Sequence, residues 1–329
     1  MNRRMAIGSS GLGRSAEAGG VLMISKALGL VLLVLGPSAV AFLAGYTDVS
    51  QYFALGAVLA INLTLLARPI ALFAVLLPMV YAAAAATAES TDGVAALIVA
   101  VAAAVGAASS QGLHRGLLSV LAAALIGSFE PAAGVTVFER AGTMLAGCFY
   151  GVLIATTLLR SVAVETRAVH PQTALSYAVL LAVLVLIAWS AARVTEFAHG
   201  WWLPLAAAAI GEPALVGSPR HAVTRLAIGL FSTMLLVVLI QSFDTPALRV
   251  ITAASMLLLM LTVGRRTGAL QALLLTPAVL LLVQHSNLEN TVVKYLGAAF
   301  VASAIVFVAT LLGKWVLWTL RPDSGRLAA

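Results

Sequence analysis

The sequence predicts an all-α polytopic membrane protein, a transmembrane helical bundle of about twelve spans. Hydrophobic residues make up 62% of the 329-residue chain and charged residues only 9%, whereas a soluble domain carries about 25% charged residues. The apolar residues come in successive runs close to the ~17–25 residues that cross a bilayer. The lysines and arginines stand between these runs in an alternating pattern. The net charge of +7 is therefore interpreted as setting membrane orientation, and no nucleic-acid partner is expected.

The apolar runs form two sets of predicted spans, with a basic connector between the sets. Several spans are short for a bilayer, so a total of ten or eleven remains an alternative. The first set covers 27–45, 51–67, 69–87, 93–109, 112–129 and 141–159, and the second covers 174–192, 201–216, 226–242, 247–263, 268–283 and 295–318.

In the first set, basic residues fall where a chain with a cytoplasmic N-terminus needs them. Lys26 precedes the first span, Arg68 separates the second from the third, Arg115 begins the fifth and Arg160 follows the sixth. Positively charged loops stay on the cytoplasmic side of a membrane. The intervening outer loops carry acids instead, among them Asp48, Glu89, Asp92, Glu130 and Glu139.

The second set repeats this alternation, so the sequence predicts a membrane protein with both termini in the cytoplasm. Arg265 and Arg266 precede the eleventh span, and Lys314 and Arg321 lie at the inner end of the twelfth. The exceptions among the 19 basic residues, which fall on the outer side, are Arg140, Arg193, Arg249 and Lys294.

This scheme divides the chain into five regions. They are a cytoplasmic tail over 1–26, a first six-span half over 27–160, a cytoplasmic connector over 161–173, a second six-span half over 174–318 and a cytoplasmic tail over 319–329. Two halves with an even number of spans share one orientation. They would form a parallel repeat, and its interface is where a substrate path is expected.

The N-terminal region has an alternative interpretation as a cleavable signal peptide. Arg3 and Arg4, the apolar run from Ala27 and the small residues around Val40 are the parts of such a signal. The stretch before the apolar run is longer than a signal allows, and the run continues past the small residues. We therefore expect a retained tail, which its glycines and serines predict to be disordered.

The chain lacks the common sequence signatures of catalysis. It contains no Gly-rich phosphate loop, no CxxC pair and no HExxH motif, and its predicted connections are short. The only cysteine, Cys148, lies inside a predicted span, so no intramolecular disulfide can form. We expect no enzyme activity, no catalytic residue, no cofactor and no metal site.

Glu212 is the strongest candidate functional residue, because it falls within the predicted eighth span beside Pro213. A charged residue in the hydrocarbon region costs about 2.5–3.5 kcal/mol on insertion scales and is a functional hypothesis by default. When protonated it is cheaper to bury, so it could carry a coupling proton. The alternative is that Glu212 lies near the cytoplasmic end and pairs with Arg220 or Arg225.

Proline and glycine recur around Glu212 and predict a broken helix. The residues are Pro204, Gly211, Pro213, Gly217 and Pro219. Irregular backbone at membrane depth survives only where protein or a water-filled cavity satisfies the freed groups, and interrupted helices often form transporter binding sites. A simple kink is the alternative.

Four further residues could attract or orient an organic anion. His221 and Arg225 begin the predicted ninth span, Arg140 begins the sixth on the outer side, and Trp202 begins the eighth. Topology alone could explain Arg225, but the positive-inside rule does not explain Arg140. The alternative for Arg140 is simple pairing with Glu130 and Glu139. Trp202, with Trp201, is also explained as part of an interfacial aromatic belt.

A resemblance to a known family emerges at these residues. In the second half it rests on Trp202, Pro204, Leu205, Glu212, Pro213, Gly217, Ser218, Arg220, His221, Ala222, Arg225 and Gly229, and in the first half on Glu139, Arg140, Gly142, Thr143 and Gly147. They resemble the motifs of the fusaric-acid-resistance and aromatic acid exporter (FUSC-like) family of inner-membrane proteins. The first-half spacing is off by one residue on either side of the Gly-Thr pair. Many members also carry a large soluble domain where this chain has only the connector.

The resemblance implies export of small organic or aromatic acids, energised by the proton gradient. The expected partners are the lipid bilayer and a small organic anion, and a homo-oligomer is left open. One alternative is a non-transporting membrane subunit or assembly partner of a cell-envelope complex, which the missing soluble domain favours. Others are an enzyme acting on lipid-linked substrates and a ten-span exporter of another family.

Overall fold

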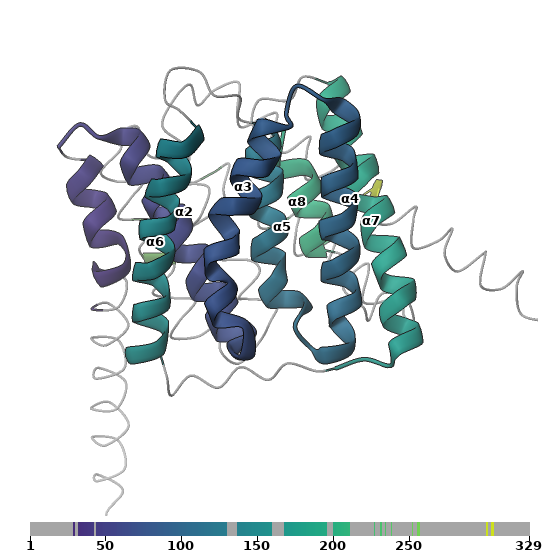
Figure 1. Ribbon diagram of the computed structural model, residues 1–329, viewed down its shortest axis with the longest axis horizontal. Helices are drawn as coiled ribbons and strands as arrows, with labels where there is room; N and C mark the ends of the chain where they lie inside the picture. The colour runs from purple at the N-terminus through teal and green to yellow at the C-terminus, as the bar shows by residue number, and fades with distance from the viewer. Residues whose placement is uncertain are drawn as a thin grey trace, which may run out of the picture.

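The computed structural model describes residues 29, 32–42, 44–129, 137–159, 168–195 and 200–210, together with single residues between 227 and 305. Within these ranges the chain is helical, with turns and short connections and no strand (Figure 1). The predicted all-α class is confirmed for this part of the chain. The predicted spans from 226 to 318 and the repeat of two halves lie largely outside it.

The described helices follow one another up and down through a bundle (Figure 1). A helix over Leu32–Phe42 comes first. It is followed by α2 (Thr47–Leu66), η1 (Arg68–Val75), α3 (Leu76–Ala86), α4 (Thr91–Ala107), η2 (Ala108–Gln111), α5 (His114–Phe129), α6 (Val137–Thr157), α7 (Pro171–Val194) and α8 (Trp202–Ile210). We call the end at which α2, α4, α6 and α8 begin the outer end, after the predicted orientation, and the opposite end the inner end.

Four of the described helical segments are long and apolar enough to cross a membrane. They are Asp48–Leu66, Thr91–Gln111, Val137–Thr157 and Pro171–Val194, and the shorter apolar helices are Leu32–Phe42, Phe73–Ala86 and His114–Phe129. Each overlaps one of the spans predicted from the apolar runs. The structure therefore confirms apolar helices of membrane-spanning length.

The predicted span over 69–87 differs from a single α-helix. Its first part is the 3₁₀ helix η1, and α-helical geometry begins only at Leu76. Pro78 falls in the first turn of α3, where a proline is tolerated, but an α-helix extended through Ala74 would bring the proline ring against that residue's carbonyl. The tighter 3₁₀ turn before α3 is consistent with this restriction.

The most extensive helix pairing joins α2 to α6 and depends on glycine. A Cβ atom at Gly147 would overlap the backbone of Phe53, one at Gly151 would overlap the backbone of Ala57, and one at Gly56 would overlap the backbone of Met144. Small residues let membrane helices approach backbone to backbone, where dispersion contacts supply the attraction. Gly147 and Gly151 have the four-residue spacing typical of such interfaces.

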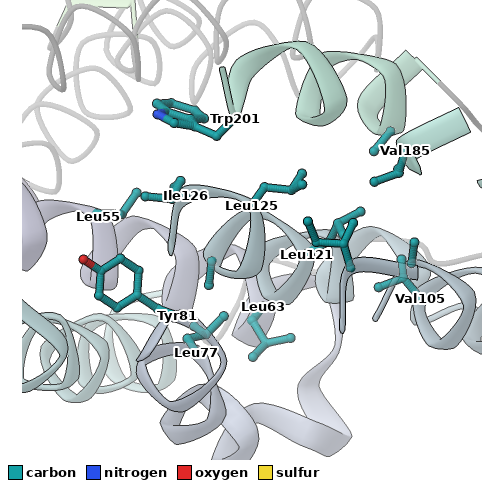
Figure 2. Close-up of a cluster of buried hydrophobic side chains, with 14 of the residues drawn as sticks. Leu55, Leu63, Leu77, Tyr81, Val105, Leu121, Leu125, Ile126, Val185 and Trp201 are labelled. Atoms are coloured by element: carbon teal, nitrogen blue, oxygen red, sulfur yellow. The ribbon is translucent and has the colours of Figure 1, made fainter. Parts of the chain in front are cut away.

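Helix α5 lies at the centre of the described bundle. It contacts α2, α3, α4 and α8, and every residue from Leu121 to Ser128 is buried. Figure 2 shows part of the surrounding core, with Leu121, Leu125 and Ile126 projecting from α5 among side chains of neighbouring helices. A helix that is apolar on all sides is typical of a protein core or a membrane span.

A side-chain hydrogen bond joins α2 and α5 in this core. The Asn62 amide Nδ2 donates to Ser119 Oγ at 2.9 Å. We expect Asn62→Leu and Ser119→Ala each to destabilise the fold, with a coupling of about 0.6 kcal/mol and at most about 1.7 kcal/mol, as for other interhelical hydrogen bonds in membranes. A double-mutant cycle of unfolding in mixed detergent measures this coupling. Strictly additive effects would contradict it.

Candidate functional site

The structure describes two of the six candidate residues predicted from the sequence. Arg140 lies in the first turn of α6 and Trp202 begins α8. Glu212, Pro213, His221 and Arg225 lie outside the described residues, so their predicted roles rest on the sequence.

Arg140 lies at the outer end, against an aromatic ring of a neighbouring helix. Its guanidinium carbon is 5.3 Å from the centre of the Tyr52 ring on α2. The Tyr52 ring packs in turn against Tyr81 on α3, with centres 5.6 Å apart and an interplanar angle of 59°. Both tyrosines are buried and Arg140 is half-buried. The site therefore joins α2, α3 and α6.

The glycine pairing of α2 and α6 explains why Tyr52 and Arg140 meet. Both helices run from the outer to the inner end, and Gly56 lies directly against Met144. Four residues earlier on each helix, one turn nearer the outer end and on the same faces, stand Tyr52 and Arg140. The close backbone approach thus sets the register that places the cation over the ring.

The chemistry of this arrangement suits an organic anion. A guanidinium over an aromatic face gains about 0.5–1 kcal/mol when exposed and about 2 kcal/mol or more when desolvated. The planar guanidinium can also donate two parallel hydrogen bonds to a carboxylate. The site therefore offers a cation held partly out of water beside apolar rings.

Trp202 and its neighbour Trp201 are packed inside the bundle. Trp202 is 6% exposed and Trp201 2%, and their rings meet edge to face with centres 5.4 Å apart. Figure 2 shows Trp201 lying over the part of α5 that carries Leu125 and Ile126. Rings of an interfacial belt would lie at the lipid boundary. Packing against α5 and α7 thus explains both residues better than the belt interpretation.

Arg193 belongs to a second outer-end cluster that sequence reasoning left unassigned. Its Nη2 donates to the carbonyl oxygen of Ala88 at 2.8 Å. Its guanidinium carbon lies 5.3 Å from the ring centre of Trp189 and 5.8 Å from that of Phe129. The spacing of Trp189 and Arg193, four residues apart on one helix face, was a usable signal. The contacts with Ala88 and Phe129 join residues far apart in the chain, so no local sequence pattern predicted them.

The two arginine clusters are not brought together. Figure 1 shows α6 and α7 on opposite sides of the central helices, so Arg140 and Arg193 form separate sites at the same end of the bundle.

At the inner end, His114 begins α5, is 7% exposed and meets the Tyr177 ring of α7 edge-on, with ring centres 6.1 Å apart. His114 was not among the candidate residues predicted from the sequence.

Among the described residues, no group of three or more histidine, cysteine, aspartate or glutamate side chains could hold a metal ion. Comparison of the chain with protein-family models, curated proteins and solved structures finds no match.

Proposed function

We propose that this chain is a FUSC-like exporter of the inner membrane, which moves small organic or aromatic acids outward at the expense of the proton gradient. It would do so with about twelve spans in two parallel six-span halves and with both termini in the cytoplasm. The observation that carries the proposal is the placement of Arg140, a half-buried cation over the Tyr52 ring at the outer end of an apolar bundle.

The position of Arg140 needs a reason other than topology. Positive residues on the outer side run against the orientation rule. A carboxylate-binding site near the outer mouth of a transport path supplies such a reason, because a guanidinium binds a carboxylate through charge-assisted hydrogen bonds. The adjacent tyrosine rings would lie beside the apolar part of the acid.

In this proposal the residues of the second half carry the proton and the inner part of the path. Glu212, within a predicted span, is the proton carrier, and Pro213 breaks the helix beside it so that backbone groups can line the path. His221 and Arg225 would attract the anion from the cytoplasm. Trp202, buried in the bundle, would pack at the outer start of the same predicted span.

A second candidate is a non-transporting membrane subunit that assembles with a cell-envelope complex. The short connector over 161–173 favours it, because the resemblance leads one to expect a large soluble domain at this place. Such a subunit would bind a protein partner and move no solute.

Transport by membrane vesicles tests the proposal. Inverted vesicles containing the chain are expected to accumulate one or more acids from a panel of aromatic and aliphatic carboxylic acids, and accumulation should stop when a protonophore collapses the gradient. Vesicles prepared without the chain are the control. If no acid in the panel accumulates above this control while the chain is present and folded, the exporter proposal is wrong and the assembly partner is favoured.

A further inference from the structure

Arg193 connects three separate parts of the bundle at its outer end. It stands in the last turn of α7, with its side chain exposed. One contact is the hydrogen bond from Nη2 to the Ala88 carbonyl, in the connection between α3 and α4. Another is the approach to the Phe129 ring at the end of α5, and the third is to Trp189 on α7 itself. The side chain thus joins α7 both to the α3–α4 connection and to the central helix.

The chemistry of these contacts makes them directional and reversible. Ala88 lies two residues beyond Ala86, the last residue of α3, and so is close to the negative end of the helix dipole. A hydrogen bond from a guanidinium to such a carbonyl is charge-assisted and stronger than one between neutral groups. It is also exposed, so water can replace either partner without a buried group being left unsatisfied.

The inner end of the same helix pair is held in a different way. There Gly106 of α4 lies so close to Ala178 of α7 that a Cβ atom on the glycine would overlap the Ala178 backbone. This backbone packing has no side chain that could swing away. Near the inner end α4 and α7 therefore meet backbone to backbone. The outer end adds an exposed, displaceable arginine contact to the buried side chains of both helices, among them Val94 and Ala192.

We infer that Arg193 is a latch that holds the outer ends of α7, α5 and the α3–α4 connection closed, and that it releases when the path opens outward about the Gly106–Ala178 contact. The inference rests on the proposed function, since only a transporter needs this opening. Opening about such a pivot matches the way domains close and open around fixed contacts. The latch would act by biasing the closed state in an equilibrium between closed and open forms.

Ser128 provides a reporter of this opening. It is the penultimate residue of α5, next to Phe129, and is 1% exposed. Cys148 is the only native cysteine, so Ser128→Cys in a Cys148→Ala chain gives a single, nearly isosteric thiol one residue before Phe129, whose ring the latch contacts. In membranes, a maleimide that cannot cross the bilayer should label this thiol slowly from the outer side.

Removal of the latch is expected to expose the reporter. Arg193→Met keeps an apolar stem against Trp189 but loses the donor, and we expect labelling of Ser128→Cys to accelerate about tenfold, as the closed state loses a charge-assisted bond. Arg115→Met, which removes an exposed arginine from the inner end of α5, should leave the rate unchanged. Ser90→Cys, exposed beside the latch, should be labelled rapidly in every variant.

Two results would overturn the latch. One is an unchanged rate in Arg193→Met, and the other is an equal acceleration in Arg115→Met, which would indicate general loosening. If Arg193→Met does not fold, Arg193→Lys replaces it. Lysine can still donate to the carbonyl but lacks the planar stacking group, so we expect about a threefold acceleration, and an unchanged rate again refutes the latch. Labelling does not require transport. Failure of the latch and failure of the exporter proposal are therefore distinguishable.

Discussion

Replacing Gly147 with leucine is expected to prevent the chain from accumulating as folded protein in the membrane. Even a Cβ atom at this position would overlap the carbonyl of Phe53 on α2, so a leucine side chain would force α2 and α6 apart along their most extensive contact. Overpacking usually costs about 1–3 kcal/mol. Here the obstacle is backbone rather than a movable side chain, so we expect at least the upper end of this range, enough to unfold a marginally stable bundle.

Gly142→Leu is the matched control for this substitution. Gly142 lies on the same helix and is exposed. Apart from its own helix backbone and its chain neighbours, no heavy atom lies within 4 Å of the place where its Cβ atom would stand. Size-exclusion chromatography of detergent extracts, at equal expression, measures the folded fraction of each variant. Equal recovery of both leucine variants would mean that α2 and α6 do not pack at Gly147 as described.

Replacing Glu212 with glutamine is expected to abolish gradient-dependent export of organic acids. Glutamine has almost the same shape as glutamate but cannot take up or release a proton, so a path that uses Glu212 as its proton carrier loses its coupling. Burial of a carboxylate at membrane depth costs about 2.5–3.5 kcal/mol, and glutamine removes that cost. Membrane abundance should therefore be maintained while accumulation in inverted vesicles falls to the level of vesicles without the chain.

Glu89→Gln makes the same chemical change at the exposed connection between α3 and α4 and should leave export intact. Export that continues at the native rate in Glu212→Gln would assign Glu212 a structural role, such as pairing with Arg220 or Arg225. Loss of export in both variants would point to a general effect of charge rather than to a proton carrier.

The helical class and the positions of the helices could be predicted because both depend on local properties of the chain. Asp92 and Ser90 begin α4, where the Ser90 side chain accepts a hydrogen bond from the Gly93 amide. A polar residue before an apolar run is a local signal for the start of a helix. The succession of apolar runs between charged connections likewise locates the helices from α2 to α7 without any tertiary information.

The candidate site was less predictable, because its parts come from different helices. Arg140 was recognisable as an outer-side cation, but its position over Tyr52 depends on the register of α2 against α6. The burial of Trp202 depends on the packing of α8 against α5 and α7. No short stretch of sequence predicts this register or this packing, because both depend on contacts between helices.

The order of residues along the chain is enough to predict that lipid is its solvent, that its backbone is helical, and that its charges alternate between two sides. These properties follow from hydrophobicity and the need of each backbone group for a local hydrogen bond in a membrane. Which helices touch is a property of the tertiary structure, because close approach depends on small residues meeting across space, as Gly147 meets Phe53. The same packing brings Arg193 to Ala88, residues that are distant in sequence and whose contact no periodicity encodes.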